Sequence, residues 1–192
     1  MNIRIYLSLI LFILILSPGC LESHNHKSKE EQIYLKYDLE IMVPNNFNFT
    51  LFLPAYKNKN GSYMSINNDF EIIYGSLEIN KIGTIYGEAI EVKSNESFKI
   101  KLEKTYDYRS IQDFSGLSLA NYNNTSNHFE GYWVYYLSEK SNQTVVLNMI
   151  EEEKYSLSWS HSFRRFNSTS ELKNGWQVIK GHLESICYDK KS

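Results

Sequence analysis

Apolar and polar side chains alternate with a period of two residues over much of the chain. From Ile33 to Val43 every second residue is large and apolar, and most of the residues between them are polar. Phe98–Glu103 repeats this alternation, with lysine or glutamate at every second position. Successive side chains of a strand point to opposite faces of a sheet, so this period predicts strands that each bury one face.

Shorter runs of the same kind follow along the chain, separated by links that contain Asn, Gly or Ser. These runs are Phe49–Leu53, Phe70–Tyr74, Leu77–Ile79, Thr84–Val92 and Thr144–Ile150. Short strands at regular spacing with turn signals between them predict an all-β fold. We expect an antiparallel β-sandwich, or a partly open barrel, formed by residues 32–192 as a single domain.

Serine occupies every second position of Tyr155–Phe163, and large side chains occupy the others. This predicts one strand with a wet serine face and a buried large face, on which His161 lies. Residues 105–128 show no sustained period, so we expect a long loop there, with one helical turn near Ser110–Phe114. The C-terminal stretch fits either a helix or two strands, and Asn174-Gly175 favours strands at Trp176–Lys180 and His182–Tyr188.

The N-terminus has the three parts of a secretory signal. Arg4 precedes an apolar run from Ile5 to Leu16, and Ser17-Pro18-Gly19-Cys20 follows. A run this short does not reach the roughly 20 residues that a bilayer span requires. The segment resembles a prokaryotic lipoprotein signal with an imperfect lipobox, in which Ser17 stands where leucine is usual.

This resemblance implies that residues 1–19 are removed as a signal peptide and that lipid is attached to Cys20. An uncleaved signal helix and simple secretion are the alternatives. Residues 20–31 have almost no apolar side chains, so we expect a flexible tether that leaves the domain on the extracytoplasmic face of the cell membrane. Cys187 then has no intramolecular partner, and we expect it to be a small buried side chain.

Composition excludes two broad classes of protein. The formal net charge of the 192 residues is −2, whereas a nucleic-acid-binding domain normally carries a basic face. The hydrophobic fraction of 42% is too high for a disordered chain.

We find no sequence motif of an enzyme, a cofactor site or a metal site. His24 and His26 supply too few ligands for a zinc site, and His128 with Glu130 is expected to form a surface salt bridge. The acidic run Glu151–Glu153 is expected to be a solvated turn. The sequence therefore predicts no cofactor and no catalytic activity, and a hydrolase of envelope polymers remains the least favoured class.

One strand is large and apolar on both faces. It contains Tyr132, Trp133, Tyr135 and Tyr136. Such a strand either lies between two covered faces or leaves one aromatic face open. If open, these four residues are a candidate face for stacking sugar rings, as in a carbohydrate-binding module; if covered, they belong to the core.

Asn-x-Ser/Thr occurs seven times, where the composition gives about three by chance. The candidate glycosylation sites are Asn48, Asn60, Asn95, Asn123, Asn124, Asn142 and Asn167. This enrichment fits an archaeal surface lipoprotein, although an Asn-rich composition also produces such sites by accident. The leading hypothesis is a membrane-anchored extracytoplasmic β domain that binds envelope glycans or proteins, or has a structural role in the envelope.

Overall fold

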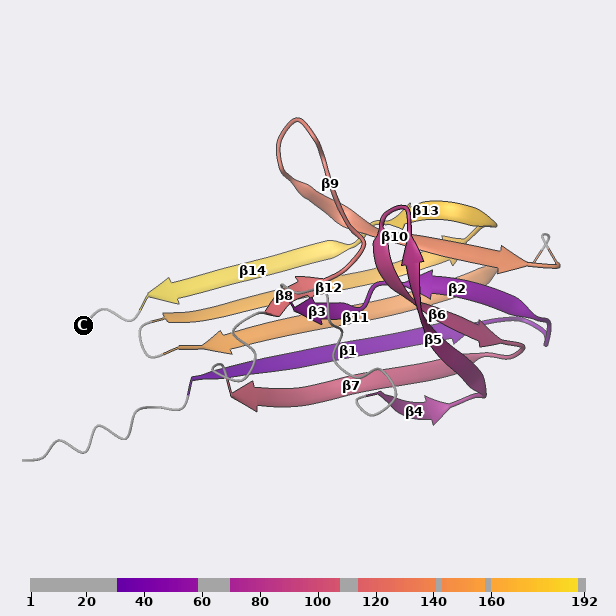
Figure 1. Ribbon diagram of the computed structural model, residues 1–192, viewed down its shortest axis with the longest axis horizontal. Coiled ribbons are helices and arrows are strands. Elements are labelled where there is room, and N and C mark those ends of the chain that lie inside the picture. Colours follow the sequence, from indigo (N-terminus) through magenta and orange to yellow (C-terminus); the bar gives the residue numbers. More distant parts are fainter. Residues whose placement is uncertain (1–30, 59–69, 108–113, 141–142, 158–159, 190–192) are drawn as a thin grey trace, which may run out of the picture.

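The computed structural model describes residues 31–58, 70–107, 114–140, 143–157 and 160–189. All elements in these ranges are strands (Figure 1). They are β1 (Gln32–Met42), β2 (Phe49–Leu53), β3 (Tyr56–Asn58), β4 (Glu71–Tyr74), β5 (Leu77–Thr84), β6 (Gly87–Ser94), β7 (Phe98–Asp107), β8 (Phe114–Leu117), β9 (Ala120–Tyr122), β10 (Phe129–Ser138), β11 (Val145–Ser156), β12 (Ser160–Leu172), β13 (Gly175–Ile179) and β14 (His182–Asp189). The expected all-β fold is confirmed.

Two antiparallel sheets form the body of the domain. The first sheet, called sheet A here, has the strand order β14-β12-β11-β1-β7-β4. The second, sheet B, has the order β13-β10-β2-β6-β5, with β9 added beside β10. A small two-stranded sheet of β3 and β8 accompanies them. This arrangement is a β-sandwich whose strands pair antiparallel throughout, as the alternating sequence predicts.

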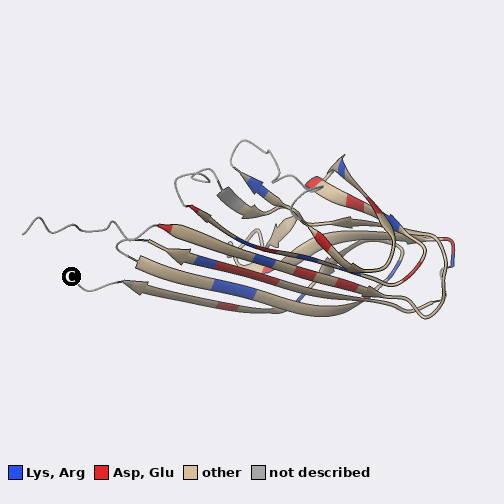
Figure 2. Cartoon of the chain, turned by 90° about the horizontal axis from the view of Figure 1, so that it is seen from below, with Lys and Arg blue, Asp and Glu red and all other residues tan. Residues whose placement is uncertain are grey.

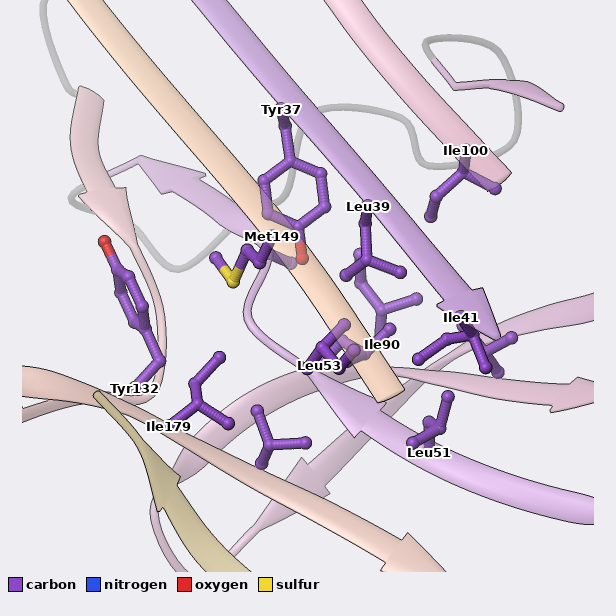
Figure 3. Packing of buried hydrophobic residues seen from close by; sticks show 14 of the residues in the cluster. Tyr37, Leu39, Ile41, Leu51, Leu53, Ile90, Ile100, Tyr132, Met149 and Ile179 are labelled. Atoms are coloured by element: carbon purple, nitrogen blue, oxygen red, sulfur yellow. The ribbon is translucent and has the colours of Figure 1, made fainter. Parts of the chain in front are cut away.

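β1 lies in the middle of sheet A, between β11 and β7. Its odd-numbered residues from Ile33 to Ile41 are buried, and its even-numbered residues face outward. The side chains of Tyr37 and Leu39 point toward those of Leu51 and Leu53 from sheet B (Figure 3). The period of two in the sequence therefore arises because every second side chain of β1 packs into one core between the two sheets.

The expectation of a single strand over Tyr155–Phe163 is wrong. The Tyr155–Phe163 run is a hairpin, because β11 ends at Ser156 and β12 begins at Ser160. The amide of Leu157 donates to the carbonyl of Ser160 across this turn, at 2.9 Å. The turn exchanges the faces of the alternating residues, so that Ser160 is buried while Ser156 is exposed.

The expected long loop at 105–128 contains the end of β7 and the strands β8 and β9, while residues 108–113 lie outside the described part. The C-terminal stretch forms the two strands that Asn174-Gly175 favours, and the helical alternative is wrong. Cys187 is exposed on β14 instead of buried, because β14 is the edge strand of sheet A.

Candidate ligand-binding surface

The outward faces of the two sheets differ in chemistry. On sheet A, residues of alternating charge stand opposite one another across five neighbouring strands. From β7 to β14 they are Glu103, Lys36, Glu152, Arg165 and Glu184. Lysine, arginine and acidic residues lie side by side on these long strands in Figure 2. This is the pattern of a solvated sheet face, in which each charge has opposite charges beside it.

The outward face of sheet B carries aromatic rings. Trp176 of β13, Tyr135 of β10 and Phe52 of β2 stand opposite one another in one cross-strand row. Glu91 of β6 and Asn80 of β5 continue the same row. Three strands thus place aromatic rings next to one another, and the following two strands end the row with a carboxylate and an amide.

Five rings make up this surface, which we call the aromatic patch: Phe52, Tyr86, Trp133, Tyr135 and Trp176. The rings of Phe52 and Tyr135 stack with their centroids 4.8 Å apart, and Trp176 lies at 5.9 Å and 5.4 Å from them. None of the five is buried in the core. Each of the five rings therefore contacts at least one other ring of the patch.

Tyr86 reaches the patch from the turn between β5 and β6. Its ring stacks on that of Trp133 at 4.1 Å, with an angle of 9° between the two planes. It also meets Trp176 edge to face at 4.9 Å. The tip of the β5–β6 hairpin therefore folds over the end of the patch formed by Trp133 and Trp176, and Tyr86 is the most exposed of the five rings.

The four aromatic residues singled out in the sequence do not share one face. Tyr132 and Tyr136 point into the core, with exposed fractions of 0% and 2%, so the expectation that they join a binding face is wrong. Trp133 and Tyr135 are half-buried on the outward face, because neighbouring residues of β10 alternate between the two sides of sheet B. No second sheet covers them among the described residues. Sequence reasoning missed Phe52 and Trp176, which reach the patch through pairing between distant strands. It also missed Tyr86, which reaches the patch from the β5–β6 turn.

A second cluster lies inside the sandwich, where the sequence suggested a solvated turn. Glu151 and Glu153 belong to β11 and face inward, with exposed fractions of 0% and 4%. The guanidinium of Arg164 lies 3.7 Å from a carboxylate oxygen of each. The expectation for Glu151–Glu153 is wrong because Arg164, on the neighbouring strand β12, compensates charge that would otherwise be expelled to water.

Both carboxyl groups of this cluster accept hydrogen bonds from tyrosine hydroxyls. The Tyr132 hydroxyl donates to Glu151 Oε2 at 3.3 Å, and the Tyr155 hydroxyl donates to Glu153 Oε2 at 3.4 Å. Burial, together with the charge of Glu153, raises the pKa of Glu151 to about 8. A carboxyl group with a raised pKa suits acid–base chemistry, but a substrate must reach it, and the side chains of Glu151 and Glu153 are almost fully enclosed.

His128 and Glu130 do not form an ion pair within the described residues. Glu130 instead accepts hydrogen bonds from the amides of Asn121 and Asn123, at 3.2 Å and 3.3 Å. No group of three or more His, Cys, Asp or Glu side chains in the described ranges is placed to hold a metal ion. His24 and His26 lie outside those ranges, as does Cys20.

The candidate glycosylation sites differ in accessibility. Asn48, Asn95, Asn124 and Asn167 are exposed. Asn123 is half-buried, and its side chain is engaged by Thr125 and Glu130. Asn60 and Asn142 lie outside the described residues.

Comparison with known proteins adds no relative: no family model, curated protein or solved structure matches the chain. Within the described part, no helix is long and apolar enough to span a membrane.

Proposed function

We propose that this protein is a lipid-anchored extracytoplasmic glycan-binding protein, whose ligand-binding surface is the aromatic patch of sheet B. The observation that carries the proposal is the contrast between the two outward faces. The outward face of sheet A carries a row of alternating charges, whereas the outward face of sheet B carries five aromatic rings. Aromatic rings grouped on the outward face of a sheet offer a surface on which a ligand can stack.

The chemistry of the patch suits sugars. One face of a pyranose ring is an array of C–H groups that packs against an aromatic ring, while its hydroxyls need hydrogen-bond partners. Phe52, Tyr135 and Trp176 supply the rings, and Glu91 and Asn80 supply polar groups in the same cross-strand row. A ligand that is apolar on one side and polar at its edges matches this row.

The proposed location rests on the N-terminal segment of the chain. The lipoprotein-like segment that ends at Cys20 supports attachment to the membrane by lipid, and residues 20–31 would connect this lipid to β1. Envelope glycans are abundant outside the membrane, where such a tether would hold the domain.

Tryptophan fluorescence offers a direct test, because Trp133 and Trp176 both belong to the patch. Full-length protein in detergent micelles is titrated with oligosaccharides from an array of envelope-type glycans. We expect Tyr135→Ala to weaken binding about ten-fold or more, since a buried aromatic contact contributes on the order of 1–3 kcal/mol.

Tyr34→Ala is the matched control, because Tyr34 lies on the outward face of sheet A. It should leave the affinity unchanged. If no glycan binds, or if Tyr34→Ala and Tyr135→Ala weaken binding equally, the aromatic patch is not a glycan-binding surface.

A further inference from the structure

A pocket of about 480 Å³ opens at one end of sheet B. It lies where β2 and β5 begin and where β6 and β10 end, and residues of all four strands line it. Its size falls within the range of sites for small ligands. Hydroxyl, amide and carboxylate groups make up most of its polar lining, among them Thr50, Glu78, Asn95, Ser138 and Glu139.

The pocket continues the outward face that carries the aromatic patch. Leu137, Thr50, Lys93 and Glu78 stand opposite one another across β10, β2, β6 and β5, and all four line the pocket. This row lies two residues along from the row of Tyr135 and Phe52, which corresponds to about 7 Å. A chain-like ligand that packs on the patch therefore has its next unit at the mouth of the pocket.

The charges of the lining favour one kind of ligand. Lys93 is already paired with Glu91, at 3.2 Å. Glu78 and Glu139 form no ion pair with any described residue, so the charge left for a ligand is negative. Carboxylates bind an ammonium or an amide N–H by charge-assisted hydrogen bonds and repel an acidic sugar.

The pocket also lies at the end of the domain opposite to Gln32, the first residue of β1. β1 begins at Gln32, next to the tether, and runs to Met42, from which a short link leads to β2 beside the pocket. Its 11 residues span about 35 Å. In Figure 1, β1 starts at the end where β14 finishes, and the links from β1 to β2 and from β6 to β7 lie at the opposite end.

We propose that this pocket is the specificity subsite of the aromatic patch and that it takes a sugar unit bearing an amino group. The carboxylate of Glu78 or that of Glu139 binds the amino nitrogen, while the adjoining unit of the ligand stacks on Phe52 and Tyr135. This inference rests on the proposed glycan-binding function and adds to it the class of sugar and the end of the domain at which that sugar is read.

The test compares three probes on the full-length protein in detergent micelles: glucosamine oligomers, glucose oligomers with the same linkage, and oligogalacturonates. We expect glucosamine oligomers to bind about ten-fold tighter than glucose oligomers, which is the size of one charge-assisted hydrogen bond. Oligogalacturonates should bind more weakly than either of the other probes.

Variants separate the pocket from the patch. Glu78→Gln combined with Glu139→Gln should abolish the preference for glucosamine over glucose oligomers. Glu184→Gln, a charge change at the far edge of sheet A, controls for attraction of a cationic probe to an acidic protein. Tyr135→Ala should weaken binding of both oligomers.

The outcomes distinguish the two proposals. If glucose oligomers bind through Tyr135 but glucosamine is not preferred, or if the double Gln variant keeps the preference, the pocket proposal is overturned and the glycan-binding function stands. Tighter binding of oligogalacturonates overturns the amino-sugar class. If none of the probes binds, or if Tyr135→Ala has no effect on binding, both proposals fail.

Discussion

Glu151 holds a proton inside the sandwich under conditions in which an exposed glutamate is ionised. Its pKa is raised from 4.5 to about 8, chiefly by burial and then by the charge of Glu153. Below pH 4.5 the group is protonated in both the folded and the unfolded chain. Between pH 4.5 and about 8 the unfolded chain loses this proton while the folded chain keeps it.

The free energy of unfolding should therefore fall as the pH rises through this window, by up to about 1.4 kcal/mol per pH unit from this group, and should level off above it. Glu151→Gln removes the titration, so we expect a flatter pH profile in urea unfolding measured from pH 4.5 to 8.5. Glu152→Gln is the control, since Glu152 faces outward and pairs with Arg165 at 3.5 Å. Equal slopes for wild type and Glu151→Gln would show that Glu151 is ionised in the folded protein.

Gly131 is required by its backbone. Its φ is 150°, next to an irregularity in the pairing of β9 and β10. A Cβ at this position would overlap the carbonyl oxygen of Ile179 on the neighbouring strand. We expect Gly131→Ala to lower the free energy of unfolding by about 2 kcal/mol.

Gly83→Ala is the matched control, because a Cβ at Gly83 meets nothing within 4 Å. Its effect should stay within about 0.5 kcal/mol, as for other surface substitutions. Denaturant titration followed by far-UV circular dichroism compares the two variants with wild type. If Gly131→Ala unfolds at the same urea concentration as Gly83→Ala, the backbone at residue 131 relaxes freely.

At the scale of the elements, the tip of the β5–β6 hairpin extends beyond the strand that supports it. β2 ends at Leu53, opposite Ile90, so the residues of β6 before Ile90 pair only with β5. The stack of Tyr86 on Trp133 attaches this tip to β10. The hairpin and the aromatic patch thus depend on the same contact.

Tyr86→Ala should accelerate amide hydrogen exchange in the turn and the adjoining residues 82–89, with little change elsewhere. A double-mutant cycle of Tyr86→Ala and Trp133→Ala should give a coupling free energy of about 0.5–1.5 kcal/mol, as for other aromatic pairs. Ile85→Ala is the control at the same tip, because Ile85 is 82% exposed. A coupling near zero would mean that the tip is held by its own hairpin hydrogen bonds.

The alternation of apolar and polar residues in the sequence predicts some strands directly. β1 follows the alternation of Ile33–Val43, and β7 follows that of Phe98–Leu102. The turn after Ser156 was missed because no Gly, Pro or Asn marks it and the alternation of residue types runs through it. Burial of Glu151 and Glu153 was missed because it depends on Arg164, which becomes their neighbour only when β12 pairs with β11.

The sequence predicts only part of the aromatic patch, again because the rest depends on strand pairing. The sequence of β10 shows that both of its faces are large, but it does not show which face is covered. Phe52 and Trp176 become neighbours of Tyr135 through pairings with β2 and β13. Such pairings join distant parts of the chain, and a single sequence without a related structure contains no local signal for them.

At the scale of the whole molecule, the start of β1 and the proposed pocket lie at different ends of the domain. β1 starts at the end where β14 finishes, because Gln32 and Tyr188 stand in one cross-strand row with Ser156 and His161. The pocket lies at the opposite end of the strands. A membrane attachment before Gln32 would therefore join the domain at the end opposite to the pocket.

This arrangement depends on the lipid expected at Cys20, and the chain contains a matched control for that expectation. Cys20→Ser should release the protein into the soluble fraction after cell lysis, whereas Cys187→Ser should leave it in the membrane, because Cys187 lies on β14 within the folded domain. Fractionation with and without high salt separates insertion from surface charge. Retention of Cys20→Ser in the membrane with residues 1–19 still attached would identify the uncleaved N-terminal helix as the anchor. Release of both variants and of wild type would indicate secretion without an anchor. The inference that the pocket lies away from a membrane attachment would then be wrong.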